Sequence, residues 1–124
     1  MPKILVAEDD DDVRIYLYDE LTAAGYTVTG VGNGADAIVA AAEESFDLIV
    51  LDMLMPGLDG VQTIRVLRKI RPSLPIIGLT GYVGLGYMAQ AACHGVICLP
   101  KPVSISDLLK EIREIVPPDT QPEG

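Results

Sequence analysis

Apolar residues recur along the chain in two patterns, short unbroken runs and longer segments in which every third or fourth residue is apolar. The short runs are typical of strands buried on both faces of a sheet, and the longer segments are typical of one face of a helix. We therefore predict strands at 4–7, 27–31, 46–52, 75–79 and 96–99. We predict helices at 11–24, 33–44 (or from 36), 61–70, 87–93 and 104–116.

Strands and helices alternate five times in this pattern. Such alternation predicts an α/β fold in which (βα)5 units form a doubly wound, parallel, five-stranded sheet with helices on both faces. The carboxyl ends of all strands then lie at one edge of the sheet, where such folds bind ligands. We expect one domain over residues 1–116 and a flexible, proline-rich tail over 117–124.

Asp52 occupies the most informative position in this pattern, because it ends the most apolar predicted strand. An unpaired carboxylate inside such a strand would cost several kcal/mol to ionise. At the carboxyl end of the strand it stands instead in the ligand-binding crevice. The position therefore predicts a reactive or metal-binding carboxylate.

Other polar residues follow the remaining strands at the same predicted edge. Glu8 and Asp9 come after the first strand, Thr80 after the fourth and Lys101 after the fifth. Crowded carboxylates repel one another unless a cation lies among them, and oxygen ligands favour Mg²⁺ or Mn²⁺. A lysine and a hydroxyl could then bind an oxyanion. The set resembles a phosphoryl-transfer site with Asp52 as the nucleophile.

The charge balance excludes several classes of partner. Eighteen acids and nine bases give a net charge of −9, whose field repels nucleic acids and anionic membranes. The sequence contains neither a membrane-length apolar stretch nor a secretory signal, so we expect a cytoplasmic protein. Cys93, His94 and Cys98 are one ligand short of a closed zinc site, and we expect the thiols to be structural.

In four segments, 4–10, 47–60, 75–81 and 101–102, the chain resembles the receiver domain of two-component response regulators. The resemblance covers residues 3–116 and implies the CheY-like, flavodoxin-like strand order 2-1-3-4-5. It implies that Asp52 accepts a phosphoryl group from a phosphohistidine on a histidine kinase or a histidine phosphotransfer protein. It also implies that Mg²⁺ is held by Glu8, Asp9, Asp52 and the backbone carbonyl of Leu54.

The resemblance assigns roles to the other residues of the edge as well. Lys101 would pair with Asp52 and then with the acyl phosphate, through a cis peptide bond to Pro102. Thr80 would be the switch hydroxyl, and Gly81 and Met53 would contact the phosphoryl group. Such a module catalyses only its own phosphorylation and dephosphorylation. It signals by a changed affinity for an output protein, unknown here, as a monomer or a phosphorylation-dependent dimer.

The chain departs from the family pattern at Cys98, where receivers usually carry the tyrosine or phenylalanine that rotates when the switch hydroxyl moves. Tyr82 and Tyr87 are candidate substitutes for this ring. Leu54 and Tyr82 also occupy the two positions that tune water access to the phospho-aspartate. Because both are bulky, we expect slow self-dephosphorylation.

Two other functions remain open from the sequence. A pseudo-receiver would bind its partner constitutively, its switch damaged at Cys98. A phosphatase similar to haloacid dehalogenases would need a second acid two residues after the nucleophile, where this chain has Leu54. The segment 30–35 also fits the dinucleotide pattern G-x-G-x-x-G/A, but it follows the second strand, so we interpret it as a tight turn.

Overall fold

The computed structural model describes residues 1–55, 57, 59–81 and 95–118. In chain order the elements are β1 (Lys3–Ala7), α1 (Asp11–Ala23), β2 (Thr27–Val31), α2 (Gly34–Glu43), β3 (Leu48–Asp52), α3 (Gly60–Ile70), β4 (Ile76–Thr80), β5 (Ile97–Pro100) and α5 (Ile105–Ile115). These bounds lie within two residues of the predicted ones. The predicted helix at 87–93 and part of the predicted tail, 119–124, lie outside the described residues.

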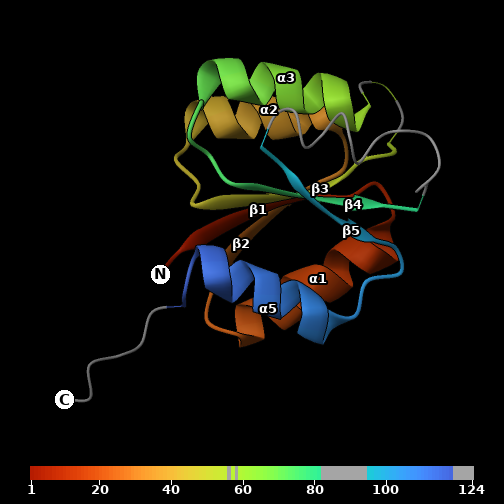
Figure 1. Cartoon of the computed structure of the whole chain (residues 1–124), viewed down its shortest axis with the longest axis vertical. Helices are drawn as coiled ribbons and strands as arrows, with labels where there is room; N and C mark the ends of the chain where they lie inside the picture. Colours follow the sequence, from red (N-terminus) through yellow and green to blue (C-terminus); the bar gives the residue numbers. More distant parts are fainter. Residues whose placement is uncertain (56, 58, 82–94, 119–124) are drawn as a thin grey trace.

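The five strands form one parallel sheet in the order β2-β1-β3-β4-β5, which confirms the predicted doubly wound fold. Figure 1 shows α2 and α3 side by side on one face of the sheet and α1 and α5 on the other. No helix of the described part of the chain is long and apolar enough to cross a membrane.

The core follows from the apolar runs of the central strands. Every residue of β3 and β4 is buried, as expected for strands covered on both faces. One apolar cluster lies between the sheet and α2 and α3, and includes Met53 and Leu67. The second lies between the sheet and α1 and α5, and includes Leu21 and Ile112. These layers hold the strand ends in fixed positions.

Polar side chains fix where the helices start. Asp10, Asn33, Asp59 and Ser104 each accept a hydrogen bond from a backbone N–H in the first turn of the following helix. Such caps satisfy donors that have no partner within the helix. Each of these helices therefore begins at a position that a polar side chain defines.

Candidate functional site

A hollow of about 340 Å³ lies at the carboxyl edge of the sheet. The residues that directly follow β1, β3, β4 and β5 meet there because the strands are parallel. Its lining consists of Glu8, Asp9, Asp10, Asp52, Leu54, Gly81 and Lys101. The edge therefore brings together most of the residues that the sequence placed there.

Asp52 is the last residue of β3, and it is only 3% exposed. One carboxylate oxygen, Oδ2, accepts a hydrogen bond from Lys101 Nζ at 3.2 Å. The other, Oδ1, accepts the backbone N–H of Leu54 at 3.1 Å. The carboxylate is thus buried, but a lysine ammonium and a backbone donor compensate for its loss of contact with water.

Lys101 follows β5 directly, and its peptide bond to Pro102 is cis, as predicted. The backbone N–H of Lys101 donates to Thr80 O at 2.8 Å, which ties the lysine to the end of β4. Its ammonium also lies 3.5 Å from Glu8 Oε1. Burial alone would lower the pKa of Lys101, but the charges of Asp52 and Glu8 raise it above its usual value. The side chain is therefore a permanent cation in the site.

Glu8 and Asp9 complete a cluster of acids with Asp52. Carboxylate oxygens of the three residues all lie within 4.8 Å of one another. Burial, opposed by the Asp10 N–H that donates to Glu8 and reinforced by the charge of Asp52, raises the pKa of Glu8 to about 7. Three oxygen donors that repel one another at this distance fit a hard divalent cation such as Mg²⁺ or Mn²⁺.

The remaining predicted residues lie close to this cluster. Thr80 ends β4 and is 1% exposed, while Gly81 follows it on the lining of the hollow. A methyl group built on Gly81 would meet no atom of the described residues within 4 Å, so these residues leave the space above its backbone open. Leu54 also lines the hollow, and it is 45% exposed. Tyr82 lies outside the described residues.

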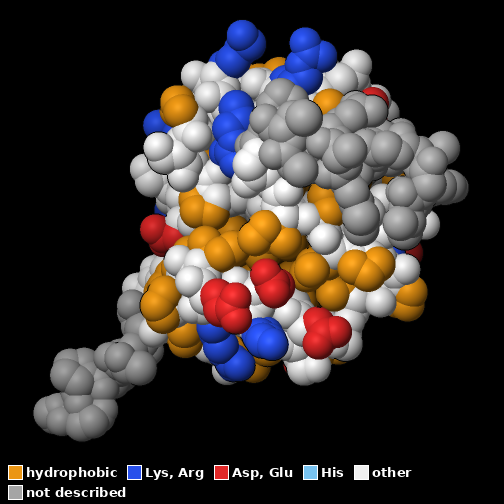
Figure 2. Space-filling view, viewed as in Figure 1, with side chains coloured by type: hydrophobic (Ala, Val, Ile, Leu, Met, Phe, Trp, Pro, Cys, Tyr) orange, Lys and Arg blue, Asp and Glu red, His pale blue; other side chains and the backbone are white. Residues whose placement is uncertain are grey.

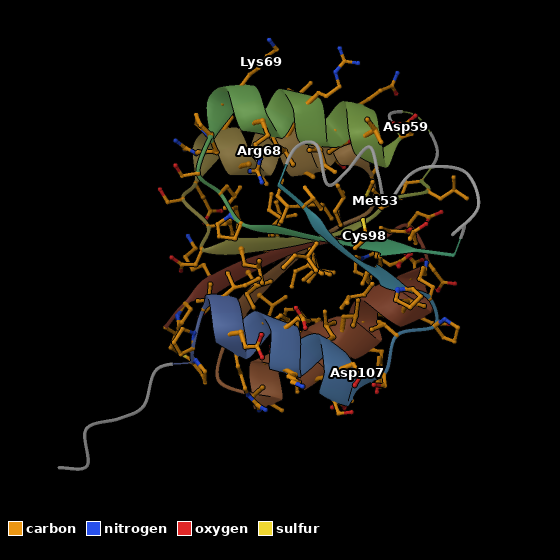
Figure 3. All side chains as sticks on the ribbon, in the orientation of Figure 1. Met53, Asp59, Arg68, Lys69, Cys98 and Asp107 are labelled. Carbon is orange, nitrogen blue, oxygen red and sulfur yellow. The ribbon has the colours of Figure 1, made fainter. Side chains whose placement is uncertain are left out.

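Met53 lies differently from the other predicted site residues. Its backbone N–H donates to Leu79 O at 2.8 Å, and its side chain is buried in the core. Figure 3 shows Met53 and Cys98 on the same side of the sheet. A methyl group on Gly78 would lie 2.9 Å from Met53 Sδ and 3.0 Å from Cys98 Sγ. The two sulfur side chains therefore fill the space above Gly78. A contact between Met53 and a phosphoryl group stays a prediction, and these contacts do not favour it.

Cys98 is half-buried on β5, directly opposite Gly78 of β4. Burial raises the pKa of its thiol, so the group is a neutral packing residue. This agrees with the prediction of a structural thiol for Cys98. Its role in the switch stays a prediction. Cys93 and His94 lie outside the described residues.

Arg14 was missed by the sequence reasoning. Its guanidinium donates to the backbone carbonyl of Glu8 at 2.8 Å and pairs with Asp11. A methyl group on Gly30 would lie 3.2 Å from the Arg14 side chain, so the glycine lets the arginine lie across β2. The glycine-rich segment at 30–35 thus makes room for a side chain that supports the acidic loop. The sequence feature that could have identified Arg14 is its position as an isolated base in the acidic first turn of α1.

Comparison with known proteins agrees with this geometry. A family model described as "Response regulator receiver domain" matches residues 4–113. The response regulator receiver protein CpdR of Brucella abortus is 38% identical over 117 residues, which are 94% of this chain and 98% of that protein. The response regulator MprA of Mycobacterium ulcerans is 36% identical over 115 residues. The match covers 92% of this chain but only 50% of MprA, so the chain spans about half the length of that relative.

Among solved structures, the response regulator TrrA of Thermotoga maritima in complex with Mg²⁺-BeF superimposes with a TM-score of 0.85. It is 27% identical, and the match covers 94% of this chain and 100% of TrrA. The fold, the acidic edge and the family match over nearly the whole described domain lead to one assignment. The chain belongs to the receiver domains of two-component response regulators.

Proposed function

We propose that the protein accepts a phosphoryl group on Asp52 from a phosphohistidine of a histidine kinase or a histidine phosphotransfer protein. The observation that carries the proposal is the Asp52 carboxylate, buried between the Lys101 ammonium and the Leu54 N–H and beside two further acids. A carboxylate held in this way is oriented toward the hollow and cannot be solvated freely. It is therefore a prepared nucleophile.

In the transfer step, a carboxylate oxygen of Asp52 attacks the phosphorus of the donor. The P–N bond to the donor histidine breaks, and its electron pair stays on the imidazole nitrogen, which takes up a proton. Lys101 stabilises the negative charge on the phosphoryl oxygens, and the Thr80 hydroxyl donates a hydrogen bond to one of them. The open space above Gly81 admits the group.

The resident cation in this proposal is Mg²⁺, held by Glu8, Asp9, Asp52 and the carbonyl of Leu54. When bound, it supplies charge neutralisation for the transferred group. The closeness of the three carboxylates, whose oxygens lie within 4.8 Å of one another, supports a cation between them. The solved relative TrrA, which carries Mg²⁺-BeF, supports the same choice of metal.

The output is a changed affinity for a protein partner, with Thr80 as the switch residue. The Met53–Cys98 packing above Gly78 occupies the region where family members usually rotate an aromatic ring. We further propose that the protein has no catalytic turnover beyond its own phosphorylation and slow dephosphorylation. Neither Leu54 nor Met53 can serve as the general acid that a haloacid-dehalogenase-like phosphatase needs.

The test is incubation with phosphoramidate or acetyl phosphate and MgCl₂, read by intact mass. We expect wild type to gain one phosphoryl group and Asp52→Asn to gain none. Asp47→Asn is the matched control, because Asp47 is an exposed aspartate at the opposite edge of the sheet. EDTA should abolish the gain on wild type.

Two outcomes would contradict the proposal. No gain on folded wild type at saturating donor would favour a pseudo-receiver that binds constitutively. Continuous release of product from an aryl phosphate, beyond one equivalent per protein and lost in Asp52→Asn, would favour a phosphatase. A phosphoryl lifetime of seconds would contradict only the expected slow self-dephosphorylation.

A further inference from the structure

The charges of this acidic chain are segregated along the sequence. None of its eighteen acids lies between Asp59 and Asp107, whereas five of its nine bases do. Four of these five bases lie on α3 or directly after it, at Arg65, Arg68, Lys69 and Arg71. In Figure 2 basic side chains stand together over α3, while acidic and basic side chains are mixed over α5. Within the described residues, α3 therefore carries a local positive surface in a negative field.

Two of the four bases are engaged by the fold. Arg68 donates to the backbone carbonyl of Leu74, and Arg71 donates to that of Ala41 at 3.0 Å. These contacts attach the last turn of α3 to the β4 entry and to α2. They also hold the helix in one orientation, so its outer face is a fixed surface.

Arg65 and Lys69 lie one helical turn apart on that outer face, and both are exposed. Neither forms an ion pair with any residue in the described ranges. In the sequence, residues 82–94 include no aspartate or glutamate. Figure 3 shows Lys69 pointing away from the sheet. The two cations are therefore available to a partner.

An apolar floor lies between the two cations. Gln62, Arg65, Val66 and Lys69 line a shallow hollow of about 240 Å³, and we call these four residues the α3 ridge. Val66 is half-buried, and Ile70, one turn further along, is exposed. An aliphatic side chain placed between two cations is the arrangement that suits an acidic peptide with one apolar residue.

We propose that the α3 ridge is a docking surface for an acidic segment of a partner protein. Carboxylates of the segment pair with Arg65 and Lys69, and one apolar side chain contacts Val66. The acidic remainder of the domain repels such a segment. The charge pattern therefore determines both the position at which the segment binds and its rate of association. The surface is separate from the carboxyl-edge site and does not depend on phosphorylation of Asp52.

Charge also decides between this partner and two others. A nucleic acid would meet a domain with a net charge of −9 and only two available cations on the ridge. A second copy of the chain would bring a second net charge of −9 to the interface. A short acidic segment carries far less total charge, so it meets the least repulsion for the same local attraction.

The experiment uses the full chain and a fluorescein-labelled 12-residue peptide that carries four acidic residues around one central leucine, with serine and glycine at the other positions. Binding is measured by anisotropy, and the contact surface by chemical-shift mapping on ¹⁵N-labelled protein. We expect shifts on α3 around Val66. The double variant Arg65→Glu/Lys69→Glu should bind at least about tenfold more weakly. The matched control Lys110→Glu/Arg113→Glu makes the same charge change on α5 and should stay within about twofold.

The remaining outcomes each decide the proposal. Equal weakening by both double variants would show a diffuse charge effect and overturn it. Absence of binding at millimolar peptide, or shifts confined to other elements, would also overturn it. If a 12-base-pair DNA duplex bound more tightly than the peptide, the partner of the α3 ridge would be a nucleic acid and not an acidic protein segment. If light scattering detected a dimer of wild type that Arg65→Glu/Lys69→Glu did not form, the partner of the α3 ridge would be a second copy of the chain. Circular dichroism confirms that each variant is folded.

Discussion

The two edges of the sheet each carry a hollow, and the larger one is not the candidate site. At the amino edge, residues 45–47 and 70–75 line a hollow of about 410 Å³, against about 340 Å³ at the carboxyl edge. The amino-edge lining combines exposed polar residues with proline and leucine, and its aspartate, Asp47, is exposed. Among the described residues, buried acids lie beside a lysine at the carboxyl edge alone. Chemistry in this fold therefore follows buried charge rather than the size of the hollow.

An ion pair near each edge shows the same contrast. Lys3 and Glu44 lie 2.6 Å apart, but both side chains are more than one third exposed. Lys101 and Asp52 are further apart at 3.2 Å, yet the Asp52 side chain is almost fully buried. Water screens the first pair and barely reaches the carboxylate of the second. The longer contact should therefore matter more, and four predictions test that comparison.

The largest effect should come from Lys101→Ala. The variant loses the cation that faces both Asp52 and Glu8, so phosphorylation of Asp52 by phosphoramidate should slow at least about 100-fold. Lys3→Ala removes a lysine of the exposed pair and should leave the rate within about twofold. Rates are read by intact mass over time. If the two variants were phosphorylated at similar rates, the buried pair at the carboxyl edge would matter no more to the reaction than the exposed pair at the amino edge.

Glu8 should make the metal-free protein less stable as the pH rises. Its folded pKa of about 7 exceeds its ordinary value of 4.5, so the folded protein keeps a proton that the unfolded chain releases. This stabilisation is complete below about pH 4.5 and is lost as the pH rises through about 7. We expect a decrease in the free energy of unfolding on the order of 2 kcal/mol.

Urea unfolding in EDTA at several pH values measures this decrease, and Glu8→Gln should remove most of it. Asp47→Asn, which alters an exposed acid at the other edge, should leave the profile unchanged. If wild type and Glu8→Gln gave parallel profiles, the buried acid would not be the titrating group.

Arg14→Ala should weaken Mg²⁺ binding by about tenfold, because the arginine orients the Glu8 carbonyl and with it the acidic loop. Calorimetric titration with MgCl₂ measures the change. Arg14→Lys keeps the charge but loses the two-pronged contact, so it should restore only part of the affinity. Full restoration would mean that charge alone, and not position, is what Arg14 supplies.

The smallest effect is expected for the exposed pair itself. Glu44→Gln should lower the free energy of unfolding by less than about 1 kcal/mol, and the decrease should shrink in 1 M NaCl. Urea midpoints at low and high salt provide the measurement. A loss of several kcal/mol would show that the 2.6 Å distance, and not burial, determines the strength of these pairs.

Much of the fold could be predicted from local pattern, because each strand is a run of apolar residues and each described helix is capped by a polar one. The positions of Asp52, Glu8, Asp9, Thr80 and Lys101 also followed from the pattern, since parallel strands place their carboxyl ends together. Arg14 could not be found in this way. Its partner is a backbone carbonyl six residues away, and its space comes from a missing side chain on β2.

The sequence by itself determined which residues lie at strand ends, and hence which charges gather at one edge. Only the tertiary structure decided how those charges are balanced. Burial raises the pKa of Glu8. Lys101 follows β5 and donates a hydrogen bond to Asp52 at the end of β3, which lies two strands away in the sheet. Met53 turns into the core beside Cys98. These outcomes depend on distances between segments far apart in the chain and on the exclusion of water. Neither quantity is carried by the pattern of any single segment.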